Sequence, residues 1–262
     1  MSATWDAIFK YGEVDNRFGL TSPLFTISVI ASYLLFVYQI GPRFMKNRPA
    51  FQLKQFMTIY NVLQVGACLY IVTAIWDLES WGIFDFNKCI TYEVNTLNRA
   101  KFDTLTYFTF WLKIAELCDT VVFVLRKKER QITYLHVFHH SSTITLVYLF
   151  LKYYRGNGAL YPIYLNSWVH VIMYTYYFFA NICSAEVMKK FISIKKSITI
   201  IQMIQFCFIL AHAAIMWSNC QIPALLKAYH CLIVLVIFYG FYDFYKKAYT
   251  NSQASKLKNK AK

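Results

Sequence analysis

Seven apolar runs of about 20 residues each constrain the fold of this 262-residue chain more than any other feature of its sequence. At a rise of about 1.5 Å per residue, a helix of this length crosses a hydrocarbon core of about 30 Å. The strands of a membrane β-barrel are about 10 residues long and alternate apolar with polar side chains, a pattern that the runs lack. We therefore predict an all-α, polytopic membrane protein with one domain over residues 1–262. Its seven transmembrane helices are expected to enclose a substrate tunnel, at roughly 23–41, 56–75, 104–125, 136–154, 159–180, 198–217 and 224–245.

Lysine and arginine residues are concentrated in the segments that follow the first, third, fifth and seventh spans. These basic clusters lie within 43–54, 126–130, 189–196 and the tail 246–262. Because cytosolic loops of membrane proteins carry an excess of basic residues, we predict a cytosolic C-terminus and a luminal N-terminus. The same distribution accounts for the net charge of +14 without any nucleic-acid partner.

Two further features bear on the cellular compartment. Lys258 and Lys260 in the tail match a di-lysine signal for retrieval to the endoplasmic reticulum, although an ordinary solvated charge run is the alternative interpretation. Cys89 and Cys220 fall in loops that we predict to lie in the lumen. An oxidising lumen permits a disulfide between them, but the sequence does not establish that they are close enough to bond.

Polar and ionisable side chains interrupt four of the predicted spans, where each charge costs several kcal/mol near the bilayer centre. At about 100° per residue, the members of each set share one helical face. In the predicted orientation most of them lie in the cytosolic half, whereas the luminal halves are mostly apolar. We therefore predict a polar chamber that opens to the cytosol and continues into an apolar interior suited to a hydrocarbon chain. The four faces are Lys113, Glu116, Asp119 and Thr120; His136, His139 and His140; Asn166, His170, Tyr174 and Tyr177; and Thr199, Gln202 and Gln205.

Three kinds of protein could use such a chamber. A di-iron oxygenase needs about eight nitrogen ligands, whereas the chain has 6 histidines, of which His212 and His230 lie towards the predicted luminal side. A single metal held by three or four histidines remains open. A receptor or transporter leaves the convergence of acids, amides and imidazoles unexplained. We favour acid–base or nucleophilic chemistry without a metal, because imidazole attacks thioesters and transfers protons near neutral pH.

Four motifs in these faces resemble, in order and spacing, the boxes of the ELO family of very-long-chain fatty acid elongases, or 3-ketoacyl-CoA synthases. They are Lys-x-x-Glu-x-x-Asp-Thr at 113–120, His-Val-Phe-His-His at 136–140, Asn166 with the His-to-Tyr motif at 170–177, and Thr-x-x-Gln-x-x-Gln at 199–205. The resemblance implies an acyltransferase of the endoplasmic reticulum that condenses a fatty acyl-CoA with malonyl-CoA and releases CO₂ and CoA. It implies no cofactor, and it implies a ketoreductase, a dehydratase and an enoyl reductase as partners. A homo-oligomer stays open.

The resemblance also implies roles for individual residues. His139 would carry the acyl group as an acyl-imidazole, while His170 would position the malonyl thioester or stabilise its enolate. His136 and His140 would support His139 or act as acid and base. The soluble condensing enzymes use a cysteine instead, but Cys118 lies about 120° from the polar face of its span. The remaining residues would bind substrate or orient the histidines: Lys113, Glu116, Asp119, Asn166, Tyr174, Tyr177, Gln202 and Gln205.

Some contacts with substrate cannot be assigned from the sequence. The basic loops 126–130 and 189–196, with Lys246 and Lys247, border the predicted cytosolic mouth. They could attract the phosphates of CoA or the head groups of anionic lipids. Lys227 could close the luminal end of the tunnel, but snorkelling to the interface is the favoured interpretation. The accepted acyl chain lengths are not predicted.

Overall fold

Helices form nearly all of the regular structure in the computed structural model, which describes residues 17–92 and 96–251. Within these residues the helices combine into seven rods, and each rod overlaps one predicted span. Two predictions concern residues outside this range: the luminal position of residues 1–16 and the retrieval signal at Lys258 and Lys260. The elements are α2 (Pro23–Leu35), η1 (Phe36–Ile40), α3 (Gly41–Met45), α4 (Lys54–Glu79), η2 (Ser80–Phe84), α5 (Leu97–Ala115), α6 (Leu117–Leu125), η3 (Glu129–Gln131), α7 (Tyr134–Tyr153), η4 (Asn157–Ala159), α8 (Leu160–Ile182), α9 (Ala185–Lys190), α10 (Ile192–Asn219), α11 (Ala224–Tyr245) and η5 (Lys246–Asn251).

Side-chain caps determine where three of the rods begin. The Ser22 hydroxyl accepts a hydrogen bond from the Leu24 amide at 3.2 Å, and Pro23 occupies the first helical position, where its missing N–H costs nothing. Thr96 caps α5 in the same way, and the Thr133 hydroxyl accepts from the His136 amide at 3.2 Å. The cap at Thr133 therefore places the histidine motif in the first two turns of α7.

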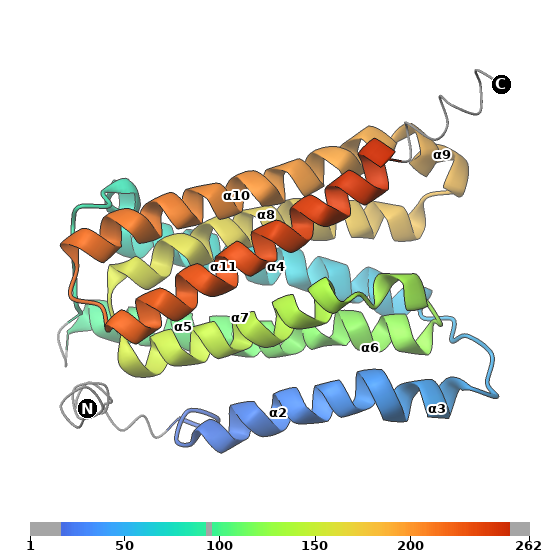
Figure 1. Cartoon of the computed structure of the whole chain (residues 1–262), viewed down its shortest axis with the longest axis horizontal. Coiled ribbons are helices and arrows are strands. Elements are labelled where there is room, and N and C mark those ends of the chain that lie inside the picture. Colours follow the sequence, from blue (N-terminus) through green and yellow to red (C-terminus); the bar gives the residue numbers. More distant parts are fainter. Residues whose placement is uncertain (1–16, 93–95, 252–262) are drawn as a thin grey trace.

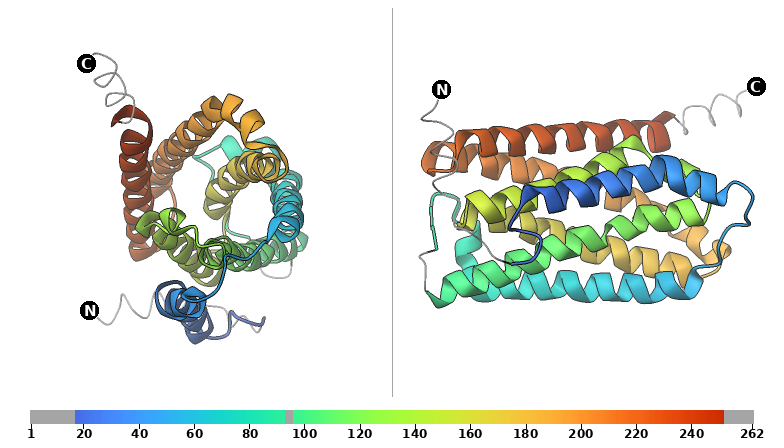
Figure 2. Two further views of the ribbon diagram at one scale, coloured as in Figure 1. Left: turned by 90° about the vertical axis from the view of Figure 1, so that its right-hand side faces the viewer. Right: turned by 90° about the horizontal axis from the view of Figure 1, so that it is seen from below.

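The rods lie side by side, and the rod formed by α2, η1 and α3 lies outside the others (Figures 1 and 2). Among the inner rods, α4 packs most extensively against α8, α10 against α11, and α5 against α7. Two buried groups attach the outer rod: the Tyr33 hydroxyl and Thr120 Oγ1 on α6 are 2.7 Å apart.

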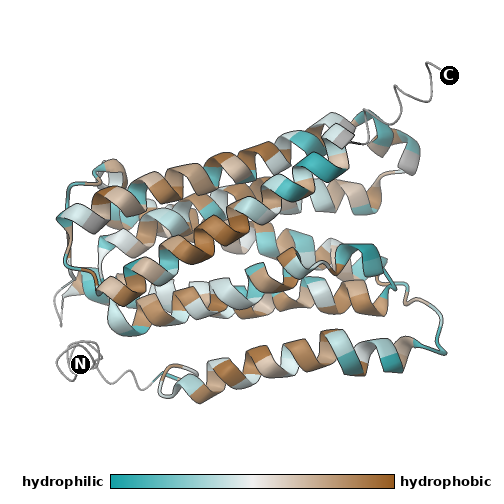
Figure 3. Cartoon of the chain, viewed as in Figure 1, coloured by the Kyte–Doolittle hydropathy of each residue, from teal (hydrophilic) through white to brown (hydrophobic). Residues whose placement is uncertain are grey.

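Four rods are long and apolar enough to cross a membrane within the described residues: Pro23–Met45, Lys54–Phe84, Ser193–Met216 and Ala224–Thr250. The other three, α5–α6, α7 and α8, carry most of the polar residues singled out above. In α2, α10 and α11 the middle of the helix is mostly hydrophobic, and hydrophilic residues gather towards the end where the basic clusters lie (Figure 3). Leu24, Ile59 and Leu232 are each more than half exposed, as side chains in contact with lipid tails would be.

The rod predicted at 104–125 differs in detail from a single helix. It begins earlier, at Leu97, and is interrupted at Glu116 between α5 and α6. There the Asp119 amide donates to the Glu116 carbonyl at 3.1 Å, a tighter turn than the α-helical pattern. The interruption falls on a fully buried carboxylate, so a local change of backbone geometry accompanies a polar site.

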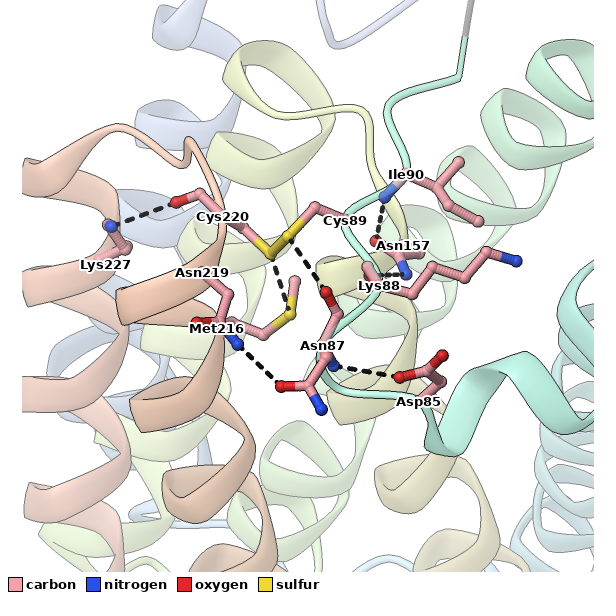
Figure 4. Close-up of a disulfide and its surroundings, with 10 residues drawn as sticks. All are labelled: Asp85, Asn87, Lys88, Cys89, Ile90, Asn157, Met216, Asn219, Cys220 and Lys227. Atoms are coloured by element: carbon pink, nitrogen blue, oxygen red, sulfur yellow. Dashed lines mark hydrogen bonds between the residues drawn. A yellow bond between two sulfur atoms is a disulfide. The ribbon is translucent and has the colours of Figure 1, made fainter.

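At the end opposite the basic clusters, a disulfide joins Cys89 to Cys220, with 5.5 Å between their Cα atoms (Figure 4). Asn157 connects η4 to the same loop: its amide nitrogen donates to the Lys88 carbonyl at 2.7 Å, and its amide oxygen accepts from the Ile90 backbone at 3.0 Å. Asn219 also donates to Asn87 Oδ1 at 2.8 Å. This end of the bundle is therefore fastened by a covalent bond and by hydrogen bonds between the loops.

Candidate active site

A cavity of about 100 Å³ lies among α5, α7, α8, α10 and α11. Most of its wall is apolar and includes Phe102, Leu146, Phe206 and Val234. Four predicted site residues, one from each of four helices, supply polar groups to the same wall. They are Lys113, His139, Asn166 and Gln205. An apolar cavity with a few convergent polar groups is the usual form of a site for a small or chain-like molecule.

Among the three histidines of α7, His139 is the one that lines this cavity. The ring of His140 packs edge-on against it at 5.5 Å between centroids, and the ring of His136 contacts that of His140 at 4.4 Å. Within the described residues, His139 Nδ1 is buried without a hydrogen-bond partner. A buried polar atom of this kind costs free energy unless a partner arrives. His136 Nε2 and His140 Nδ1 are in the same state, so all three histidines have unused bonding capacity.

A buried network joins α5 to α8 next to His139. Lys113 Nζ donates to Glu116 Oε1 and Oε2 at 2.8 and 3.0 Å and to Asn166 Oδ1 at 2.7 Å. Glu116 is fully buried and Lys113 is 7% exposed. The Lys113 ammonium thus offsets the desolvated carboxylate and uses its three protons in doing so.

This network also fixes the orientation of two polar groups. Because an ammonium can only donate, the oxygen of the Asn166 amide must face Lys113, and its NH₂ group is left to donate elsewhere. The Nδ1 atom of His170 lies 2.8 Å from the backbone carbonyl oxygen of Asn166. Since a carbonyl can only accept, Nδ1 carries a proton. The Nε2 atom of the same ring lies 3.7 Å from Glu116 Oε2.

The other predicted site residues surround the cavity at a greater distance. The Tyr174 hydroxyl donates to Asp119 Oδ2 at 2.7 Å. Gln202 contacts Met173 Sδ at 3.7 Å and does not line the cavity. Tyr177 packs against the ring of Tyr174 but is 40% exposed. These side chains can at most hold the inner residues in place in this conformation.

Sequence reasoning missed several polar side chains near the site. His230, which was set apart from the histidine motif, lines the same cavity. On α4, Asn61 and Gln64 are 2% and 3% exposed, and Tyr60 packs against the ring of Tyr174. The spacing of Asn61 and Gln64, three residues apart in an apolar run, was a detectable sign of a further polar face. Within residues 17–92 and 96–251, no group of three or more His, Cys, Asp and Glu is arranged to hold a metal ion.

Comparison with known proteins gives consistent matches over almost the whole chain. A family model described as "ELO: GNS1/SUR4 family" matches residues 18–257. Very long chain fatty acid elongase 4 of Mus musculus is 31% identical over 239 residues, which cover 90% of this chain and 75% of the relative. Very long chain fatty acid elongase 1 of Homo sapiens is 34% identical over 242 residues (88% and 84%). Elongase F of Drosophila simulans is 33% identical over 199 residues (74% and 75%).

Proposed function

The chain belongs to the ELO (GNS1/SUR4) family of fatty acid elongases, and on that premise we propose that it condenses a long-chain acyl-CoA with malonyl-CoA. The product is a 3-ketoacyl-CoA two carbons longer than the acyl substrate, and CO₂ and CoA are released. The observation that carries this proposal is the cavity itself, in which His139 adjoins a largely apolar space. An acyl chain fits such walls, and its thioester carbon then lies next to a nucleophile.

In the first step, His139 attacks the thioester carbon of the acyl-CoA. The carbon–sulfur bond breaks, the electron pair leaves with the CoA thiolate, and the acyl group stays on the imidazole. The thiolate takes a proton from solvent. An acyl-imidazole remains reactive towards a carbon nucleophile, which makes imidazole a suitable carrier for this purpose.

In the second step, loss of CO₂ from malonyl-CoA leaves an enolate, which attacks the acyl carbon and returns the electron pair to His139. Charge develops on an oxygen in both steps, and donors prearranged in a dry site stabilise it. The NH₂ group of Asn166 is such a donor, because Lys113 holds its amide oxygen. His170, anchored through Nδ1, positions the malonyl thioester or its enolate.

All seven rods cross the membrane in this proposal, with the basic clusters on the cytosolic side of the endoplasmic reticulum. The disulfide between Cys89 and Cys220 supports this orientation, because it lies at the opposite end, where an oxidising lumen would maintain it. CoA substrates would approach from the basic end. The 3-keto product would then need reduction, dehydration and a second reduction by partner enzymes.

The test is a condensation assay on the purified protein in detergent or vesicles. We expect CO₂ release from malonyl-CoA only when an acyl-CoA is present, with a 3-ketoacyl-CoA formed in equal amount. His139→Ala should abolish both signals. Thr145→Val is the matched control, because Thr145 lies on the same helix, does not line the cavity, and donates its hydroxyl proton to the Ser141 carbonyl at 3.0 Å. Full activity in His139→Ala, or CO₂ release without an acceptor, would contradict the proposal.

A further inference from the structure

A second, smaller cavity lies beyond the active-site cavity, towards the end of the bundle that carries the disulfide. Its volume is about 20 Å³, and its wall includes Gly158, His212, Ala213, Met216 and Lys227. By general experience a cavity of this size holds about one water molecule. The two cavities are separate spaces.

Two aromatic side chains form the partition between them. Phe150 on α7 and His230 on α11 line both cavities, and among residues 17–92 and 96–251 no other residue lines both. Their rings meet edge to face, with centroids 5.4 Å apart and planes at 88°. The His230 side chain is 8% exposed, so the pair is packed within the bundle.

The polar wall of the active-site cavity lies several helical turns from this partition. On α7, His139 and Phe150 are eleven residues apart, which corresponds to roughly 16 Å along the helix axis. An acyl chain attached near His139 would therefore run along apolar wall before its methyl end met the two rings. Up to that point each added methylene finds apolar contacts, and beyond it the chain must displace a ring.

We propose that the Phe150–His230 pair ends the acyl compartment and limits the length of the chain that this enzyme extends. This inference rests on the proposed function and adds to it the element that determines acyl-chain specificity. Lys227 does not limit the chain length in this proposal, because it lines only the second cavity and therefore lies beyond the partition.

The far side of the second cavity is closed by rigid structure. Lys227 Nζ donates to the Cys220 carbonyl at 3.4 Å, and the Met216 sulfur contacts Cys220 Sγ at 3.4 Å (Figure 4). Cys220 is itself held by the disulfide to Cys89. Removal of the partition should therefore add a short, bounded extension to the acyl compartment.

The experiment measures the distribution of product chain lengths by mass spectrometry, from a series of saturated acyl-CoAs with malonyl-CoA. His230→Ala should raise the ratio of the next-longer product to the wild-type end product by about tenfold, a usual discrimination for one or two methylenes in an apolar pocket. Ala213→Phe, which fills only the second cavity, should leave the wild-type distribution unchanged. The double variant His230→Ala/Ala213→Phe should return to the wild-type end product. Lys227→Leu is a further control and should not lengthen the product.

Each alternative outcome has one meaning. An active His230→Ala with the wild-type distribution overturns this inference and leaves the proposed function standing. Longer products that persist in the double variant also overturn it, because the added length would then lie elsewhere. Absence of condensation in the wild-type protein contradicts the proposed function instead. If His230→Ala fails to fold, Phe150→Leu opens the partition from the other side, and the same two criteria apply to it.

Discussion

Lys113 and Glu116 are buried charges that depend on each other. Glu116 is fully buried, and Lys113 Nζ lies 2.8 Å from its nearer carboxylate oxygen. Lys113→Met should lower the free energy of unfolding by on the order of 3–5 kcal/mol, because it leaves an uncompensated carboxylate in the interior. Thermal unfolding in detergent would show this as a lower Tm.

The matched variant for this prediction is Lys113→Met/Glu116→Gln, which removes both charges. Its Tm should recover most of the loss, since a neutral amide is much less costly to bury than an unpaired carboxylate. A double variant as unstable as Lys113→Met would show that the ion pair is not the cause.

Asn166 allows a test of catalysis at the level of one hydrogen bond. Asn166→Asp keeps an oxygen that accepts from Lys113 but replaces the NH₂ donor that we assign to the developing oxyanion. We expect kcat to fall by about 10²–10³-fold, the usual effect of losing one such donor. Steady-state kinetics should show a smaller change in KM. An unchanged kcat would remove Asn166 from the set of donors.

Helical spacing predicted which polar residues share a face, but it could not predict how deeply each one would be buried. Tyr174 and Tyr177 lie on one predicted face of α8, yet Tyr174 is fully buried and Tyr177 is 40% exposed. A rotation of about 60° between them is enough to turn the second ring out of the packed interface. His230 was missed because it is far from the histidine motif in the sequence. Only the packing of α11 against α7 brings it to the same cavity as His139.

Helix packing can be tested at two glycines. A Cβ on Gly41 would lie 2.6 Å from Val124 Cγ1 and 2.8 Å from the Phe36 carbonyl oxygen, whereas a Cβ on Gly66 would meet nothing within 4 Å. Gly41→Ala should destabilise the protein by about 1–3 kcal/mol, because it forces the outer rod away from α6. Gly66→Ala should stabilise α4 by about 0.5–1 kcal/mol, because alanine favours the helix.

Parallel thermal unfolding of the two glycine variants checks this pair of expectations. Opposite shifts in Tm are the expected result. Equal shifts would mean that the contact between the outer rod and α6 contributes little to stability.

At the level of helices, the sequence predicted the existence and approximate bounds of every rod, because a long apolar run is a local signal. The predicted spans 224–245 and 159–180 lie within two residues of α11 and α8 at each end. The interruption at Glu116 was not predicted, since it depends on the buried partner Lys113 and on packing between rods. Residues 192–197 are helical although four of the six are serine or lysine, so hydropathy placed the start of α10 too late.

The disulfide constrains the whole molecule, because it closes a loop of 131 residues between Cys89 and Cys220. The variant Cys89→Ala/Cys220→Ala should lose about 2–4 kcal/mol of stability. Cys207→Ala removes an exposed free thiol and is the matched control. Thermal unfolding without reductant should therefore separate the two variants. A disulfide-free protein with the wild-type Tm would contradict this account of the closed end.

For the molecule as a whole, the distribution of basic residues predicted which segments would gather at one end. The described parts of those segments, which extend to residue 251, do lie at the same end (Figure 1). The proximity of Cys89 and Cys220 could not be derived, because it depends on how the four rods between them in the sequence pack together. The contact between Phe150 and His230 could not be derived from the sequence either. The two residues are 80 positions apart, and only the packing of the helices makes them neighbours.

The central claim is that His139 carries the acyl group between the two half-reactions. Intact-protein mass spectrometry after incubation with an acyl-CoA, without malonyl-CoA, tests it most directly. We expect a mass increase of one acyl group, which disappears when malonyl-CoA is added, persists in Cys118→Ala and is absent from His139→Ala. An acyl adduct that remains in His139→Ala and is lost in Cys118→Ala would contradict the claim.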